Sequence, residues 1–149
     1  MDRAKPGSKH HLAVDANGTP LAATLTGANQ HDVTQLLPLI DAIPPIRGKV
    51  GAPQFRPGEA YADRAYDSEP HRGELRNRGI KPFLAKRNTE HGSGLGIIRW
   101  VVEQSEALLH QFRRLKMRFD KRDDIHEAFL NLAEVVICWR RLGSVMGYF

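Results

Sequence analysis

The segment from residue 59 to residue 85 reads as a strand, a helix and a second strand. Residues 59–62 form a short β candidate, a helix is expected over 67–78, and 80–85 is a second strand. Gly79 stands where glycine ends many helices, because glycine tolerates a left-handed backbone. Two strands joined through a helix run parallel in one sheet. The chain is therefore expected to be an α/β protein.

A β-hairpin is expected upstream of this unit. Two runs rich in Leu, Val and Thr, at 8–14 and 19–26, flank Asp15-Ala16-Asn17-Gly18. Asn-Gly supplies the positive φ angles that a tight reversal needs. An antiparallel hairpin and a parallel pair together predict a mixed sheet flanked by helices.

The rest of the chain alternates helices and loops. Asp32 and Gln35 make a plausible capping box for a short helix that ends before Pro44. Prolines and glycines mark 43–58 as a loop, and glycines mark 87–97 as another. Apolar residues recur at helical spacing from 98 to 119, and a final amphipathic helix is expected over 124–142.

Length and composition favour a single domain over 1–149. The 149 residues are 41% hydrophobic and 26% charged, enough for a sizeable core. No apolar run is long enough for a membrane span, and the start lacks the pattern of a signal peptide. The lone cysteine, Cys138, excludes an intrachain disulfide and is expected to be a plain buried thiol. These features favour a cytoplasmic protein without membrane partners.

Positive charge is concentrated in one segment. The net charge is +5, and between 113 and 122 only Asp120 opposes six basic residues. If the helix from 98 continues to 119, then Phe112, Leu115 and Phe119 face the core. The basic residues then point outward and are the candidates for contact with a polyanion such as DNA; they are Arg113, Arg114, Lys116 and Arg118. The alternative is an ordinary solvated face.

Asp63 directly follows the strand expected at 59–62. A residue in that place projects from the carboxyl edge of a sheet, where open α/β folds bind ligands. The alternative is that its carboxylate only caps a helix or lies in a surface turn.

Glu103 is the second candidate acid. It lies about 200° around the expected helix from Val101, and so opposite the apolar stripe, on a face that also carries Arg99, Glu106 and His110. One interpretation is a solvated face of ion pairs. The other pairs Glu103 with Asp63 as oxygen ligands for Mg²⁺, with Arg99 holding a carboxylate or a phosphate. Two acids are few for two-metal phosphoryl transfer.

Five runs of the sequence resemble the DDE-type transposases of bacterial insertion sequences, the families numbered four and five. Two of them are Tyr61-Ala62-Asp63-Arg64 and, later, Arg99-Trp100-Val101-Val102-Glu103. The order of all the runs makes the resemblance specific, and it extends over nearly the whole chain. The runs are 5–12, 15–21, 26–32, 61–67 and 99–103.

The resemblance implies a ribonuclease H-like fold and DNA transposition. In that family three acidic residues bind Mg²⁺ (or Mn²⁺). The enzyme uses the bound metal to cut transposon ends and to join them to target DNA. Asp63 matches the second acid, Glu103 the third, and Arg99 the arginine four residues before it. The resemblance implies that DNA is the main partner and that the protein is found at the nucleoid. It also implies two protein partners, an upstream transposase segment and a second copy in a homodimer.

The chain departs from the family at three places. The first catalytic aspartate lies on a central strand upstream of the run at 5–12, and Asp2, at a frayed end, is no convincing substitute. Ala65 replaces a glycine, which is a small change only if its φ is negative. His110 replaces a basic residue. The chain is therefore expected to lack its first central strand and to be inactive alone.

Two histories fit this expectation: a downstream reading frame completed by frameshifting, or a decayed remnant. The alternative function is a catalytically inactive DNA-binding remnant, or a regulator of the full-length transposase. A zinc site is not expected, because the adjacent His10 and His11 point to opposite faces of a strand and the other histidines show no ligand spacing. Phosphate-loop and nucleophile-elbow motifs are also missing.

Overall fold

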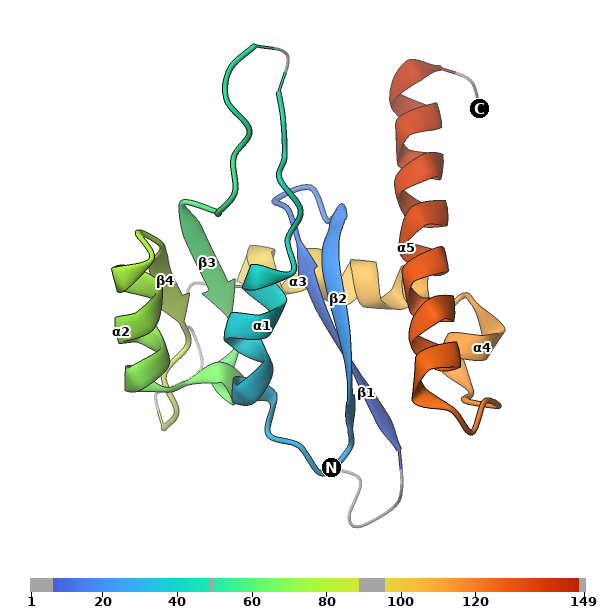
Figure 1. Cartoon of the computed structure of the whole chain (residues 1–149), viewed down its shortest axis with the longest axis horizontal. Helices are drawn as coiled ribbons and strands as arrows, with labels where there is room; N and C mark the ends of the chain where they lie inside the picture. The colour runs from blue at the N-terminus through green and yellow to red at the C-terminus, as the bar shows by residue number, and fades with distance from the viewer. Residues whose placement is uncertain (1–6, 49, 89–95, 148–149) are drawn as a thin grey trace.

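The computed structural model describes residues 7–48, 50–88 and 96–147, of which 97–99 are described by backbone alone. Small sheets and flanking helices alternate along the chain, so the predicted α/β class is confirmed (Figure 1). The hairpin lies at the centre, the parallel unit to one side and the long C-terminal helix to the other. No described helix has the length and apolar character to cross a membrane.

The predicted hairpin is confirmed. Strands β1 (Ser8–Val14) and β2 (Pro20–Gly27) pair antiparallel, with Ser8 opposite Gly27. In the turn, Asp15 Oδ1 accepts the N–H groups of Asn17 at 2.9 Å and Thr19 at 2.8 Å. Gly18 has φ +77°, a conformation that residues with a Cβ rarely adopt. The turn geometry therefore depends on the glycine that the sequence marked.

The parallel unit is also confirmed. Strands β3 (Glu59–Ala62) and β4 (Lys81–Leu84) pair parallel, and helix α2 (Glu69–Asn77) connects them. Gly79 has φ +76° just beyond the helix. The helix begins later than expected, because a 3₁₀ turn, η2 (Arg64–Tyr66), follows β3 and a proline occupies the first helical turn.

The single mixed sheet is not formed. The described strands make two separate two-stranded sheets, β1–β2 and β3–β4. Between them lies the short helix α1 (Leu36–Asp41), which packs against both hairpin strands and against α2 (Figure 1). The hairpin and the parallel unit are thus joined by side-chain packing and not by a strand ladder.

The expected capping box at Asp32 is not formed. Residues Asp32–Gln35 form a 3₁₀ turn, η1, whose N-cap is His31 and has no side-chain cap. The Asp32 carboxylate instead pairs with Lys9 Nζ at 2.9 Å. Gln35 Oε1 accepts a hydrogen bond from the Thr24 hydroxyl at 3.3 Å. Contacts with the hairpin have replaced the local cap.

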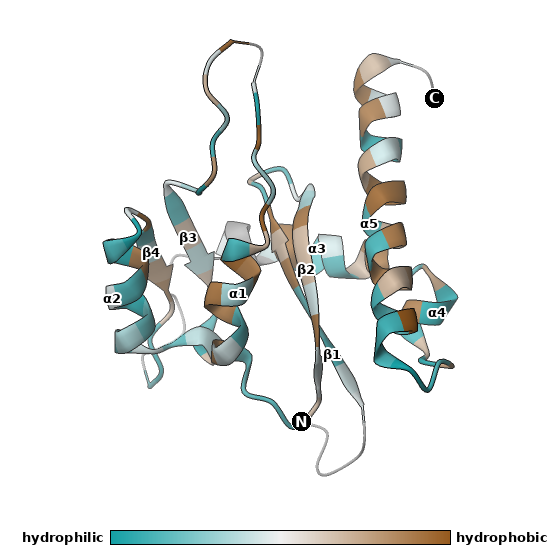
Figure 2. Ribbon diagram, viewed as in Figure 1, coloured by the Kyte–Doolittle hydropathy of each residue, from teal (hydrophilic) through white to brown (hydrophobic). Residues whose placement is uncertain are grey.

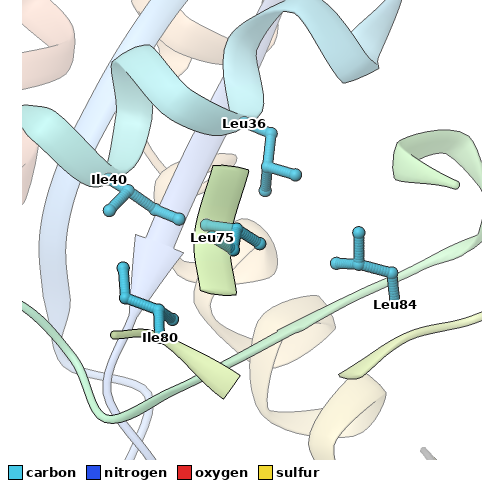
Figure 3. Close-up of a cluster of buried hydrophobic side chains, with 5 residues drawn as sticks. All are labelled: Leu36, Ile40, Leu75, Ile80 and Leu84. Carbon is cyan, nitrogen blue, oxygen red and sulfur yellow. The ribbon is translucent and has the colours of Figure 1, made fainter. Parts of the chain in front are cut away.

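A first hydrophobic cluster holds the parallel unit to α1. Leu75 is fully buried and Ile80 is 1% exposed, and the α1 and β4 side chains close around them (Figure 3). Ala62 and Tyr66, which flank Asp63, pack against the same cluster. The first cluster consists of Leu36, Ile40, Leu75, Ile80 and Leu84.

The long helix expected over 98–119 is two helices. Helix α3 (Gly96–Leu109) ends in a turn, and helix α4 (Arg113–Lys116) begins after Phe112, whose backbone is extended. The break lets Leu109 and Leu115 contact the same group of side chains on α5 (Asp123–Met146). Phe119, expected in the core, is 54% exposed. Tertiary packing has overridden a continuous helical pattern.

This second hydrophobic cluster joins α3, α4 and α5. Leu130 is fully buried, and Leu12 and Ala23 of the hairpin pack against the cluster from the side. The second cluster consists of Leu109, Leu115, Leu130, Ala133 and Ile137. Helix α5 is longer at both ends than the predicted 124–142 and is closed by Gly147 at φ +73°.

The remaining predictions concern loops and the cysteine. The loop at 43–58 is confirmed in its described residues, with an isolated bridge between Ile46 and Gln54. Of the loop expected at 87–97, residues 96 and 97 belong to α3, and 89–95 lie outside the described residues. Cys138 is half-buried, with its Sγ 3.7 Å from the Pro20 carbonyl oxygen, and burial raises the pKa of its thiol.

Candidate active site

Asp63 lies directly after β3, at the carboxyl end of the parallel pair. It is the N-cap of η2, and its Oδ1 accepts the N–H of Ala65 at 3.0 Å. The side chain is exposed. The capping role considered for Asp63 is therefore observed. Ala65 is not among the described residues with positive φ, so replacing glycine there causes no backbone strain.

Glu103 lies on α3 with its side chain exposed, and Arg99 lies one turn earlier on the same helix. The predicted role of the Arg99 side chain falls outside the described residues. Glu106 lies one turn beyond Glu103, and the pKa of its carboxyl is shifted by the charges around it. Burial raises the pKa of its carboxyl, His110 lowers it, and the carboxylates of Glu103 and Asp63 raise it further.

This electrostatic coupling joins β3 to α3. Glu106 keeps more than a third of its surface exposed, yet it feels the charge of Asp63, which lies on another element. Like charges destabilise one another's ionised forms only when they are near. Asp63 therefore lies within electrostatic range of Glu106 on α3.

Tyr66 and His11 lie beside this group. The Tyr66 hydroxyl is 3.2 Å from His11 Nδ1, and His11 Nε2 is 2.8 Å from the Thr26 hydroxyl. Burial raises the pKa of Tyr66, and the carboxylates of Asp32, Asp63 and Glu106 add to the effect. Burial also lowers the pKa of His11. The phenol therefore stays protonated next to several carboxylates.

The sequence analysis placed Glu106 on the helix face of Glu103, three residues away, but it did not predict Tyr66 and His11 as neighbours of the site. His11 and Tyr66 gave no local signal, since 55 positions separate them.

The two adjacent histidines do separate as expected for neighbours on a strand. His11 faces Tyr66, whereas His10 Nε2 lies 3.0 Å from Nε2 of His126 on α5. Across the described ranges, no three His, Cys, Asp or Glu side chains gather closely enough to hold a metal ion. Asp63 and Glu103 offer the oxygen donors that Mg²⁺ prefers, but they do not complete a site on their own.

The basic residues lie mainly on α4, beyond the break in the helix. The Arg113 guanidinium stacks over the Phe119 ring at 5.7 Å, and Lys116 is exposed. The predicted continuous helix from Glu103 into the basic run is therefore wrong. The basic side chains are carried by a separate short helix that is anchored by Leu115.

Two of the predicted DNA-binding residues also have contacts within the chain. Arg114 pairs with Asp120 at 3.2 Å and stacks over Phe129 at 4.6 Å. Arg118 pairs with Asp123 at 2.5 Å and contacts the Ser8 hydroxyl. Arg114 thus ties α4 to the turn that follows it and to α5, and Arg118 ties that turn to the hairpin.

Comparisons with known proteins place this geometry in context. The family model of the transposase DDE domain matches residues 2–137. The chain is 69% identical over 141 residues to a Burkholderia cepacia protein assigned by name as a transposase for insertion sequence element IS402. It is 29% identical over 117 residues to the transposase for insertion sequence element IS1106 of Neisseria meningitidis serogroup B.

The matches cover unequal shares of the two proteins. The first covers 95% of this chain and 67% of the Burkholderia protein, and the second covers 72% of this chain and 37% of the Neisseria protein. The chain thus spans about two thirds of one relative and little more than a third of the other. No solved structure matches the chain.

Proposed function

Because the chain belongs to the transposase DDE-domain family, we propose that it acts in DNA transposition as part of a metal-dependent transposase. The reaction is phosphoryl transfer: transposon ends are cut and joined to target DNA. Asp63 and Glu103 are the catalytic acids, and Arg99 assists them. The protein works on DNA, and so at the nucleoid of a bacterial cytoplasm.

One observation supports the site above all others. Asp63 lies 40 positions before Glu103 in the sequence (103 − 63), yet its charge and that of Glu103 both raise the pKa of Glu106. Carboxylates within electrostatic range repel one another, and a bound cation would relieve that repulsion.

The acids fit part of a magnesium site. Asp63 and Glu103 would hold Mg²⁺ (or Mn²⁺) through carboxylate oxygens. When bound, the ion would activate the attacking oxygen and stabilise the negative charge that develops on the phosphate. Tyr66, kept protonated by its surroundings, can donate a hydrogen bond into the same region.

The site needs a further carboxylate. The described residues do not gather three ligands, and the two sheets are not joined by a strand. An upstream segment of the kind that the family resemblance implies would supply both the acid and the strand, either in the same polypeptide or as a partner. A homodimer is the second proposed assembly.

End cleavage and strand transfer test the proposal. The chain joined to that upstream segment should cut and join transposon-end DNA with Mg²⁺, and Asp63→Asn or Glu103→Gln should lower the rate by about 10²-fold or more. Glu127→Gln, an exposed acid on α5, is the matched control and should leave the rate unchanged. Full activity in both acid variants would contradict the assignment.

A second function is favoured by the basic residues and by the incomplete metal-ligand set in the described part of the chain. In this alternative the chain is a catalytically inactive DNA-binding protein that competes with a full-length transposase for its ends. Binding to duplex DNA without cleavage, together with inhibition of the complete enzyme, would distinguish it. Arg113 and Lys116 are the exposed candidates for phosphate contact, with Arg114 and Arg118 positioning α4 beside them.

A further inference from the structure

The outward face of α5 carries an uninterrupted row of apolar side chains. They recur at alternating spacings of three and four residues along the helix, and all of them are exposed. Trp139 is 66% exposed, Val135 63% and Leu132 57%. We call this row the outer stripe; it consists of Ile125, Ala128, Leu132, Val135, Trp139, Leu142 and Met146.

The outer stripe is not part of the protein's own core. The second cluster uses a different face of α5, through Leu130, Ala133 and Ile137. Figure 2 shows α5 at the edge of the molecule, with hydrophobic residues along its length. A surface helix of an ordinary monomer is polar on the face turned away from its core. Helix α5 is apolar on two faces and packs only one of them.

The spacing of the stripe matches a helix–helix seam. Apolar residues that repeat every 3.5 positions face a partner helix in a coiled coil, and a repeat sustained over three heptads is specific for that packing. The seven positions span the whole of α5, from its first turn to its last. A helical partner is therefore the occupant that this pattern fits.

The area of the stripe suits association between two copies. The exposed fractions correspond to roughly 700 Å² of side-chain surface, more than the patch that soluble monomers commonly expose and close to the ~800 Å² per partner of a standard interface. Two identical stripes are complementary to each other in area and in apolar character. The stripe alone therefore offers most of the surface of a standard interface.

Charge favours an antiparallel arrangement. Glu127, near the start of α5, and Arg140, in its last third, are exposed, whereas Asp123, Asp124 and Arg141 have partners within the chain. Antiparallel helices bring Glu127 of each copy toward the end that carries Arg140 of the other, and they also align the helix dipoles favourably. Parallel helices would place like charges together.

We propose that two copies of this chain associate through the outer stripes of their α5 helices, packed antiparallel. This deepens the proposed homodimer by naming its surface, and it requires neither metal nor DNA. Val135 lies near the middle of the seam, and Leu132 of one copy faces Trp139 of the other.

Sedimentation velocity of the purified 149-residue chain tests the interface. The wild-type chain should be dimeric at about 10 µM, and Val135→Glu should weaken dimerisation at least about tenfold, because a carboxylate would be buried in an apolar seam. Val50→Glu is the matched control, since Val50 is 97% exposed in the loop at 43–58. It should dimerise like the wild-type chain.

Three results would overturn the proposal. They are a wild-type chain that stays monomeric up to about 100 µM, a dimer that Val135→Glu leaves intact, and equal weakening by Val50→Glu. In the first case the stripe would belong to another occupant, such as the part of the longer relatives outside this chain. Far-UV circular dichroism of both variants establishes that they are folded.

Tryptophan fluorescence provides a second measurement that needs no change in α5. In a Trp100→Phe variant the emission comes from Trp139 alone. It should move to shorter wavelength as the protein is concentrated, because the exposed indole becomes buried. Emission that does not change with concentration contradicts burial of Trp139 in a dimer.

Disulfide trapping tests the orientation. In a Cys138→Ser background, an equal mixture of Ile125→Cys and Met146→Cys proteins should form a crosslinked heterodimer on oxidation. Ile125→Cys protein alone should not crosslink, and if it did the helices would be parallel. Failure of the dimer with retained DNA cleavage by the completed enzyme would refute this interface and leave the transposase proposal standing.

Discussion

The Nε2 atoms of His10 and His126 lie 3.0 Å apart in a stacked pair of rings, which ties β1 to α5 across 116 positions of sequence. His126 is 1% exposed, and its Nδ1 has no hydrogen-bond partner among the described residues. Burial lowers the pKa of His10 to about 4, with His126, His110 and His11 adding repulsion. Burial and Arg118 lower the pKa of His126.

This pair should make the protein sensitive to acid. Both folded-state pKa values lie below the ordinary 6.5, so the unfolded chain takes up protons first as the pH falls. Stability is complete above pH 6.5 and declines toward pH 4. In His10→Gln the unfolding free energy should depend on pH less steeply, by about one proton, over that window. Urea titrations at several pH values measure it, with exposed His31→Gln as the control; equal slopes in all three proteins would contradict the assignment.

Glu134 should act in the opposite direction. Burial raises the pKa of its carboxyl to about 7, and its Oε1 is buried without a partner in the described part of the chain. As the pH rises, the unfolded chain therefore releases this proton first, and stability that is complete below pH 4.5 is lost progressively up to about pH 7. Glu134→Gln should stabilise the protein at pH 8 by about 1 kcal/mol after allowance for solvent screening, and by much less at pH 5. Thermal unfolding at the two pH values, beside exposed Glu127→Gln, checks this; a gain at both would argue against titration.

Two leucines on α5 should respond differently to truncation. Leu130 is fully buried in the second cluster, whereas Leu132 is 57% exposed on the outer stripe. Leu130→Ala should lower the unfolding free energy by about 3 kcal/mol, because it leaves a cavity. Leu132→Ala should cost the isolated protomer less than about 0.5 kcal/mol. Chemical denaturation at low protein concentration compares them, and equal losses would place Leu132 in the core.

Gly18 should not tolerate a side chain. Its φ is +77°, and a Cβ there would lie 2.9 Å from the hydroxyl oxygen of Ser105, which donates a hydrogen bond to the Gly18 carbonyl at 2.9 Å. Gly18→Ala should therefore destabilise the protein by about 2 kcal/mol through backbone strain and crowding. Gly73→Ala, at a glycine with open space around its Cβ position in α2, should be neutral or stabilising. Melting temperatures that rank the two variants in reverse would refute this.

DNA binding should depend on the exposed basic residues of α4. Arg113→Ala combined with Lys116→Ala should flatten the slope of log affinity against log salt by about two, since each residue would neutralise roughly one phosphate. Arg76→Ala combined with Lys81→Ala removes the same charge from the parallel unit and should leave the DNA-specific slope nearly unchanged. Fluorescence anisotropy with a labelled duplex measures both, and indistinguishable slopes would move the DNA-binding surface elsewhere.

Local patterns in the sequence predicted the hairpin, the parallel unit and the final helix. Gly18 and Gly79 fix their turns through backbone conformation alone, so nearby residues decide the outcome. The break between α3 and α4 could not be predicted in this way. Leu115 continues the helical spacing of Leu108, and only contact with α5 shows that the chain turns first.

The candidate site was predictable in part for the same reason. Asp63 and Glu103 were found from their places beside a strand and on a helix face. The neighbours of the site depend on contacts between distant segments, as between His11 and Tyr66, and so gave no local signal. The capping box at Asp32 failed because Lys9, on another element, competes for the carboxylate.

The two hydrophobic clusters divide the candidate acids between them. Asp63 follows a strand that packs on the first cluster, and Glu103 lies on a helix that ends in the second. The spacing of the two carboxylates therefore depends on the packing between the clusters, which runs from α3 through the hairpin and α1 to α2. A substitution in the hairpin can therefore displace Asp63 relative to Glu103 while both clusters keep their packing. Selection of variants by melting temperature alone would not detect that displacement.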